Sequence, residues 1–351
     1  MGGGGDSGNL PVRAVGQSMN PDATAAVTPP SIVTLTMNPA LDITADADIV
    51  RPTEKIRCGA VRYDPGGGGV NVARVAQELG AQASAVLPVG GSTGATLTGL
   101  LDEAHVPFHA IAIGGSTRES FTVNERSSGR QFRFVLPGPR LTRTEQQACL
   151  DRVRTAAAGA RFVVASGSLP PGTAPDLYQR VADIARSANA QLILDASGSG
   201  LAGISSGAFI VKPSLRELAE LAGCPLRTRA DQIDAARRLI DRGITETVVL
   251  SLGSSGALLV TAGGDRHFAP IPVHGGSGVG AGDAMVAAIA VAMCRGWPLD
   301  DAVRYGVAAG AAMLMTPGTA TCRGADVERF FSGSAGCADA SEPPNVHAAQ
   351  G

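Results

Sequence analysis

The stretch GGSGVGAGDAMVAAIAVAMC, residues 275–294, places a carboxylate where it could do chemistry. A glycine-rich turn delivers Asp283 to the first turn of an apolar helix, where the helix dipole favours negative charge, so we expect this carboxylate to be ionised. The N–H groups of Ala281, Gly282 and Asp283 would converge on a small anion. A carboxylate base beside an anion hole suits phosphoryl transfer. The alternative is that Asp283 only caps a buried helix.

A second unusual stretch is the run of four glycines, Gly66 to Gly69, which directly precedes a helical pattern over 70–79. Without side chains, backbone N–H groups can approach a small ligand closely, and the following helix N-terminus favours anions. The alternative is a flexible loop. The chain contains neither G-x-x-x-x-G-K-[ST] nor G-x-G-x-x-G, so a P-loop is excluded and a dinucleotide fold is disfavoured.

Other polar residues directly follow short apolar runs that are typical of buried strands. In an open parallel sheet, ligands bind beyond the carboxyl ends of the strands. The candidates at such ends are Asn38, Asp42, Ser166, Ser168, Asp195, Lys212, Ser251 and Gly253. Each could instead be a turn or cap residue. Ser214 and Glu217 also fit a capping box at the start of a helix.

These residues need elements that position them, and the pattern predicts alternating strands and helices. The expected helices lie at 70–79 and near 93–104, and the expected strands lie at 31–37, 83–89, 161–166, 191–196, 208–212 and 247–252. Such short apolar strands predict an α/β fold with three layers and a mostly parallel sheet. Segments 41–64 and 119–138 alternate like strands and predict a small β-sheet lid, whose apolar face would pair with a second copy; an ordinary crowded hairpin is the alternative.

Composition excludes several classes of protein. The chain has 351 residues, 44% of them hydrophobic, and a net charge of -2, which suits one large α/β domain and gives no nucleic-acid footprint. Six scattered cysteines without a C-x-x-C pattern indicate reduced thiols and a cytoplasmic protein. No signal peptide or membrane span is expected. Residues 1–30 read as a disordered leader and 332–351 as a loose tail.

Taken together, the motifs resemble the PfkB (ribokinase-like) family of sugar kinases over residues 31–331. Six motifs occur in the family's order: NPALD, PGGGGVNVAR, SGSLPPG, VKPSLRE, SLGSSGAL (preceded here by Leu250) and GVGAGDAMV. Ribokinase-type members usually have a lysine at the position of Gly68. With glycine there, this chain resembles the bacterial 6-phosphofructokinase branch of the family. The resemblance implies a ribokinase-like core with a lid that pairs two subunits, and ATP-dependent phosphorylation of fructose 6-phosphate to fructose 1,6-bisphosphate in glycolysis. Alternatives are a tagatose-6-phosphate or fructose-1-phosphate kinase, or a non-catalytic sugar-phosphate sensor.

The resemblance also implies roles for individual residues. Asp283 matches the general base, and Gly280, Ala281 and Gly282 match the anion hole. The implied substrate-binding residues are Asp42, Lys55, Gly67, Gly68, Asn71, Arg118, Arg133 and Ser168. The implied nucleotide-binding residues are Lys212, Ser214, Ser251, Gly253, Gly256 and Val307.

The implied cofactors are Mg²⁺ with ATP, and K⁺. Glu217 would position Mg²⁺ through water, although the family commonly has N-x-x-E and Ser214 replaces the Asn here. A potassium site is implied near Ser277, Val279 and Gly318, mostly from backbone oxygens.

Overall fold

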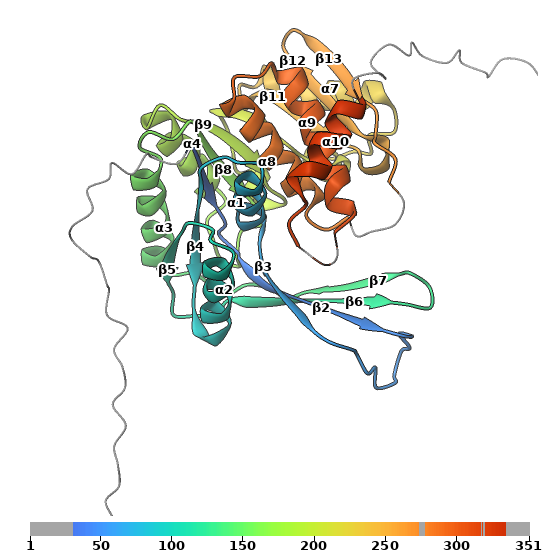
Figure 1. Cartoon of the computed structure of the whole chain (residues 1–351). Coiled ribbons are helices and arrows are strands. Elements are labelled where there is room, and N and C mark those ends of the chain that lie inside the picture. The colour runs from blue at the N-terminus through green and yellow to red at the C-terminus, as the bar shows by residue number, and fades with distance from the viewer. Residues whose placement is uncertain (1–30, 274–277, 317, 319, 335–351) are drawn as a thin grey trace, which may run out of the picture.

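The structure is a computed structural model that describes residues 31–273, 278–316, 318 and 320–334. The expected leader at 1–30 and most of the expected tail at 332–351 lie outside these residues. Figure 1 shows a layered core with helices on both sides of a large sheet, and a thin sheet that projects from one end of it.

The large sheet has nine strands in the order β13-β12-β11-β10-β9-β8-β1-β4-β5. Seven of them, from β11 to β5, run parallel, while β12 and β13 form an antiparallel edge. The strands are β1 Ile32–Leu35, β4 Ala83–Val89, β5 Phe108–Ala112, β8 Phe162–Ser166, β9 Gln191–Asp195, β10 Ala208–Val211, β11 Thr245–Ser251, β12 Ala257–Thr261 and β13 Gly264–Phe268.

Helices cover both faces of this sheet and define two hydrophobic cores. One face packs against α1 Gly68–Glu78, α2 Gly91–Glu103, α8 Ala281–Cys294, α9 Leu299–Leu314 and α10 Gly324–Gly333. The other packs against α3 Arg143–Ala156, α4 Leu177–Ser187, α5 Ser199–Ala202, α6 Leu215–Ala222 and α7 Arg229–Asp241. Along β1, Ile32 enters one core and Val33 enters the other, so the strand is apolar on both faces, as parallel sheets require.

The expected α/β fold is therefore confirmed, and all the expected core strands are present. The sequence pattern did not predict three strands near the two ends of the sheet, β5, β12 and β13. In β5 and β13, partly or fully exposed residues such as Asp265 and Arg266 interrupt the apolar run that marked the central strands, whereas β12 is apolar and buried and was missed all the same. Edge strands are commonly polar on one face, because only one face packs against the core.

The projecting sheet is the expected lid, with strand order β3-β2-β6-β7. Its strands are β2 Ala40–Ala47, β3 Arg62–Gly66, β6 Arg118–Glu125 and β7 Gln131–Val135. The central pair, β2 and β6, is parallel, and the outer pairs are antiparallel. The predicted turn between β6 and β7 contains Gly129 with a φ of 68°, a left-handed conformation that glycine adopts easily.

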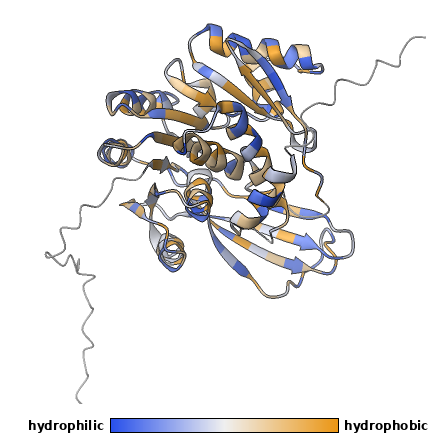
Figure 2. Cartoon of the chain, turned by 45° about the horizontal axis from the view of Figure 1, so that its top comes forward, coloured by the Kyte–Doolittle hydropathy of each residue, from blue (hydrophilic) through white to orange (hydrophobic). Residues whose placement is uncertain are grey.

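The two faces of the lid differ in character, because directly paired residues share a face. One face carries the polar residues Asp42, Asp64, Ser120, Thr122 and Arg133, and the other carries Ile43, Tyr63, Phe121 and Phe134. Figure 2 shows this alternation of hydrophilic and hydrophobic colour along the lid strands. Tyr63, Phe121 and Phe134 are 49%, 36% and 55% exposed, so the second face presents an uncovered apolar surface in the monomer.

The four glycines are explained by close contacts within the protein. A Cβ on Gly66 would lie 2.2 Å from an oxygen of the Asp42 carboxylate, and one on Gly68 would lie 2.1 Å from the hydroxyl oxygen of Ser166. A Cβ on Gly69 would lie 2.6 Å from the hydroxyl of Thr36. The glycine run thus lets β1, β2, β8 and the start of α1 meet at one point, where any side chain would displace a neighbour.

Candidate active site

The structure brings Asp283 into contact with side chains from two other elements. Asp283 lies in the first turn of α8, with Gly280 as N-cap in the left-handed conformation. Its Oδ2 accepts a hydrogen bond from Nδ2 of Asn71 at 2.9 Å, and its Oδ1 accepts one from the hydroxyl of Ser166 at 3.3 Å. Both carboxylate oxygens are therefore held by side chains from α1 and β8.

This geometry overturns the capping alternative. The N-cap is Gly280, which has no side chain, and α8 has no side-chain cap. The carboxylate of Asp283 instead points to residues 212 and 117 positions away in the sequence. Asp283 is thus placed for contact with other elements rather than for capping its own helix.

The expectation that the helix dipole tends to keep Asp283 ionised does not hold near neutral pH. Burial raises the pKa of Asp283 to about 7, and the negative charge of Asp195 acts in the same direction. The hydrogen bonds from Asn71 and Ser166 and the charge of Lys212 oppose the shift. The helix dipole is a weak effect beside the desolvation of a carboxylate. A pKa near neutrality suits a residue that must accept and later release a proton.

A buried ion pair lies next to the start of α8. Lys212 Nζ is 3.1 Å from Oδ1 of Asp195, and the two side chains are 5% and 14% exposed. A Cβ on Gly282 would lie 3.3 Å from the same Nζ, so the ammonium group sits beside the first turn of α8. Burial alone would lower the pKa of Lys212, but the carboxylates of Asp195, Asp283 and Glu217 raise it, so the lysine is charged. The ammonium group of Lys212 thus lies beside the predicted anion hole, which consists of Gly280, Ala281 and Gly282.

On the other side of Asp283 lie the residues predicted to bind substrate. Gly67 caps α1, Gly68 begins it, and the Asp42 carboxylate packs on the glycine run. Ser168 accepts a hydrogen bond from the Asn38 amide at 3.4 Å. Asn71, which donates to Asp283, follows Gly67 and Gly68 in the first turn of α1.

The predicted basic residues of the substrate side behave differently from one another. Arg118 donates to the backbone carbonyls of Asn38 and Leu136 at 3.2 and 3.1 Å, so it also holds the lid to the core. Arg133 and Lys55 are exposed on the lid. No hydrogen bond or ion pair within the described ranges connects Arg133 or Lys55 to the cluster around Asp283.

Several of the predicted nucleotide-side residues lie next to one another. Ser214 and Glu217 form the expected capping box of α6: Glu217 N–H donates to the Ser214 hydroxyl at 3.3 Å, and Ser214 N–H donates to the Glu217 carboxylate at 2.8 Å. Ser251, at the end of β11, forms a backbone bridge with Ser214. Gly253 and Gly256 shape the following turn with φ values of 58° and 86°, and Val307 lies in α9.

The donor set fits a magnesium ion that is bound mainly by phosphate and water. The described part of the chain contains no group of three or more His, Cys, Asp or Glu side chains that could hold a metal by themselves. Mg²⁺ commonly uses one or two carboxylates together with substrate phosphates. Glu217 is the predicted contact, and its capping bond uses only one of its oxygens. Of the predicted potassium site, Val279 and Gly318 are described, and Ser277 lies outside the described residues.

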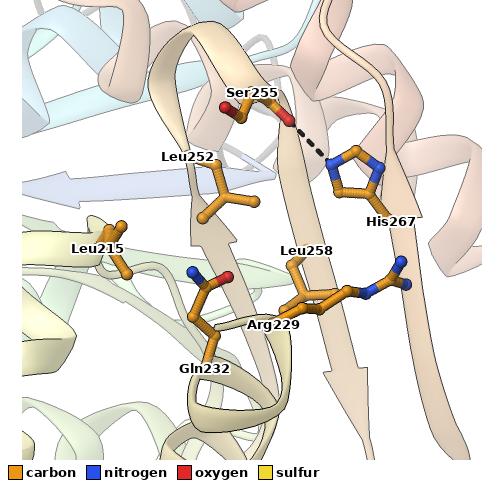
Figure 3. A pocket seen from close by; sticks show the side chains of 7 residues that line it. All are labelled: Leu215, Arg229, Gln232, Leu252, Ser255, Leu258 and His267. Atoms are coloured by element: carbon orange, nitrogen blue, oxygen red, sulfur yellow. Dashed lines mark hydrogen bonds between the residues drawn. The ribbon is translucent and has the colours of Figure 1, made fainter. Parts of the chain in front are cut away.

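A separate pocket of about 340 Å³ lies behind the turn that contains Gly253. It is lined by Leu215, Arg229, Gln232, Leu252, Ser255, Leu258 and His267. Figure 3 shows His267 hydrogen-bonded to the carbonyl of Ser255 at 2.8 Å across its upper end. None of the predicted site residues lines this pocket.

Two neighbours of the base were noted in the sequence as strand-end candidates but were not given a role. They are Ser166, which donates to Asp283, and Asp195, which pairs with Lys212. The signal that marks them is their position as the last residues of β8 and β9, adjacent strands of the sheet.

Comparison with known proteins identifies the family. The sequence profile described as pfkB family carbohydrate kinase matches residues 35–325. The chain belongs to the pfkB family of carbohydrate kinases. It is 62% identical over 302 residues to the ATP-dependent 6-phosphofructokinase isozyme 2 of Mycobacterium tuberculosis (strain H37Rv), which covers 86% of this chain and 89% of the relative.

Solved structures of pfkB kinases confirm the fold. The tetrameric inhibited form of phosphofructokinase-2 from Escherichia coli superposes with a TM-score of 0.82 at 35% identity, covering 87% of this chain and 99% of that one. The same enzyme in complex with potassium gives a TM-score of 0.83 at 36% identity, with coverage of 87% and 99%. The expected ribokinase-like architecture and the family resemblance are thus confirmed. Within the described residues, no helix is long and apolar enough to span a membrane.

The raised pKa of Asp283 leads to a prediction about stability. Asp283→Asn removes a carboxylate whose ionisation is disfavoured in the folded state, so we expect the variant to be more stable than wild type at pH 8, by roughly 5 °C in Tm. A carboxyl group with a raised pKa stabilises the fold at low pH and loses this contribution as pH rises through about 7. The advantage of the variant should therefore grow between pH 4 and 7 and level off above. Thermal unfolding across this range checks it, and an advantage independent of pH would contradict it.

Proposed function

We propose that this pfkB kinase transfers the γ-phosphoryl group of ATP to fructose 6-phosphate, giving fructose 1,6-bisphosphate. The observation that carries the proposal is the setting of Asp283, where two donors hold a carboxylate of near-neutral pKa at a helix N-terminus. The named function of the M. tuberculosis relative supports the choice of substrate.

In the proposed mechanism, Asp283 accepts the proton of the sugar hydroxyl while the hydroxyl oxygen bonds to the γ-phosphorus. The bond from that phosphorus to the bridging oxygen breaks, and ADP leaves with the electron pair. The amides of Gly280, Ala281 and Gly282 and the ammonium of Lys212 face the charge on the transferring phosphoryl group. Asp283 then releases its proton to solvent, which its pKa of about 7 makes easy at neutral pH.

The two substrates would approach the base from opposite sides. The sugar hydroxyls are assigned to Asp42, Asn71 and the backbone of Gly67 and Gly68. The substrate phosphate is assigned to Arg118, Arg133 and Ser168, with Lys55 nearby, because arginine binds phosphate through two parallel hydrogen bonds. The nucleotide is assigned to Lys212, Ser214, Ser251, Gly253, Gly256 and Val307.

Mg²⁺ is proposed to bind with ATP, with Glu217 as its protein contact through water, and it would supply charge neutralisation on the phosphates. K⁺ is proposed near Val279 and Gly318, supported by the potassium complex of the E. coli enzyme. A cytoplasmic location is supported by the free state of the five described cysteines, which suits a reducing compartment.

The competing functions differ in substrate or in catalysis. A tagatose-6-phosphate or fructose-1-phosphate kinase would use the same base, and a non-catalytic sugar-phosphate sensor would need no base. The assay is purified protein with Mg·ATP and a panel of phosphosugars, with and without Mg²⁺ and K⁺, measuring ADP release. Preference for another phosphosugar by kcat/KM would replace fructose 6-phosphate, and no turnover with any of them would favour the sensor.

The decisive variant is again Asp283→Asn, now assayed for turnover. Loss of the base should lower kcat by about 10²–10⁴-fold, while both ligands still bind within about tenfold, because the anion hole is made of backbone amides. Activity and calorimetric binding of each ligand check this. A variant that keeps more than a tenth of the wild-type kcat, with chemistry rate-limiting, would remove Asp283 from the mechanism.

The phosphate assignment is tested on Arg133, because Arg118 also holds backbone carbonyls and its loss would disturb the lid. Arg133→Ala should raise the KM for fructose 6-phosphate by about 10–150-fold, the effect of about 1.5–3 kcal/mol for a charge-assisted contact, and leave the KM for ATP nearly unchanged. Arg130→Ala is the control, since Arg130 is an exposed arginine of the same hairpin that interacts with Ser128 and Glu125. Similar effects in both variants would refute a specific phosphate contact.

We propose that two copies pair through the apolar face of the lid. Eight of the nine exposed large hydrophobic side chains of the described residues lie in the lid segments, with Met315 as the exception. Phe134→Glu should convert the dimer to a monomer, because it places a charge in the paired face. Val135→Glu should not, because Val135 is 58% exposed on the opposite face. Mass in solution by light scattering decides, and equal behaviour of the two variants would reject this interface.

A further inference from the structure

Arg74 is a buried cation near the proposed base. It lies on α1, one turn after Asn71, and its side chain is only 9% exposed. Burying a guanidinium group is costly unless its surroundings compensate the charge and its donors. Its partners therefore indicate what this position does.

Those partners connect the lid to the catalytic cluster. Arg74 Nη1 donates to the carbonyl of Pro65 at 3.0 Å and to Oδ1 of Asn71 at 3.5 Å. Arg74 Nη2 is 3.9 Å from Oδ1 of Asp64. Pro65 and Asp64 belong to β3, the lid strand that leads into the glycine run. One guanidinium thus contacts the root of the lid and the amide that holds Asp283.

The side-chain amide of Asn71 has an oxygen that accepts hydrogen bonds and an NH₂ group that donates them. Arg74 requires the acceptor, and the Asp283 carboxylate requires the donor. The Asn71 oxygen faces the Arg74 cation, and the NH₂ group faces the Asp283 carboxylate at 2.9 Å. The reversed amide would set NH₂ against the cation and oxygen against the carboxylate, which is unfavourable at both contacts. Without Arg74, the reversed amide could instead accept a hydrogen bond from protonated Asp283. Arg74 therefore favours the ionised base.

We propose that Arg74 is a positioning residue: it holds the Asn71 amide in the orientation that donates to Asp283, and it ties that orientation to strand β3 of the lid. The inference rests on the proposed role of Asp283 as base. Its consequence is that contact at the root of the lid helps to keep the base ready to accept a proton.

Other charges near the two ends must be separated from this effect. Asp283 faces Asp195 from β9 and Lys212 after β10, besides the neutral Asn71 and Ser166. Arg74 faces Asp64 and Asp42 from the lid, and also the like charge of Arg62. Asp64 is bound more closely by Arg62, at 2.8 and 3.0 Å, than by Arg74. Arg62→Ala is thus a matched control that disturbs the lid ion pair but does not touch Asn71.

The kinetic test compares Arg74→Leu, Arg74→Lys and Arg62→Ala in the pH dependence of kcat/KM for fructose 6-phosphate. We expect Arg74→Leu to move the acidic limb up by about 0.5–1 pH unit, because the donor to ionised Asp283 is weakened. Activity should fall by about 3–10-fold at pH 6 and recover toward pH 9. Arg74→Lys should shift less, and it serves if the leucine variant does not fold. An equal shift in Arg62→Ala, or a loss that does not depend on pH, would overturn the proposal.

A second measurement needs no substrate and therefore separates this inference from the proposed reaction. Thermal unfolding is followed from pH 4 to 9 for the wild-type and Arg74→Leu proteins, each with and without the additional substitution Asp283→Asn. In the wild-type background, the stabilising effect of Asp283→Asn should level off near pH 7. In the Arg74→Leu background, the same effect should continue to rise to a higher pH. Identical curves in the two backgrounds would refute the role of Arg74. Failure to phosphorylate fructose 6-phosphate would refute only the proposed function.

Discussion

The site depends on one constraint: a carboxylate must be buried at the start of α8 and still exchange a proton near neutral pH. Burial raises the pKa of Asp283, and the donors from Asn71 and Ser166 limit that rise. Each donor is supplied by a different element, so α1, β8 and α8 must meet at one point. The glycine run makes this meeting possible, because any side chain at Gly68 would occupy the space of the Ser166 hydroxyl.

The charged groups around Asp283 also affect its pKa. Asp195 raises the pKa of Asp283, whereas Lys212 lowers it and stands beside the amides of the anion hole. A lysine that is paired within a cluster of acids stays charged despite burial. In the proposed mechanism, this ion pair would act on both Asp283 and the transferring phosphoryl group.

The lid sheet has one polar and one apolar face, and it adjoins the residues around Asp283. Its polar face carries Asp42 and Arg133, two of the predicted substrate-binding residues, while its apolar face is uncovered in the monomer. The guanidinium of Arg74 lies where the lid strand β3 meets α1. The proposed substrate contacts, the proposed subunit pairing and the hydrogen bonds of Asp283 are thus connected through one short segment of backbone, residues 64–71.

The sequence by itself determined the family, the alternating core elements and the capping box of Ser214 and Glu217, because these follow from local patterns of apolar residues and motifs, and it predicted Asp283 as the base. It missed β5 and β13, whose apolar pattern is interrupted at the sheet edges, and also β12, which is apolar and buried. Only the tertiary structure decided the pKa of Asp283, the contacts of Ser166, Asp195 and Arg74, and the packing reason for the glycines. Desolvation, and contacts such as that of Ser166 with Asp283, 117 positions apart, depend on how the chain closes on itself, and no local pattern encodes them.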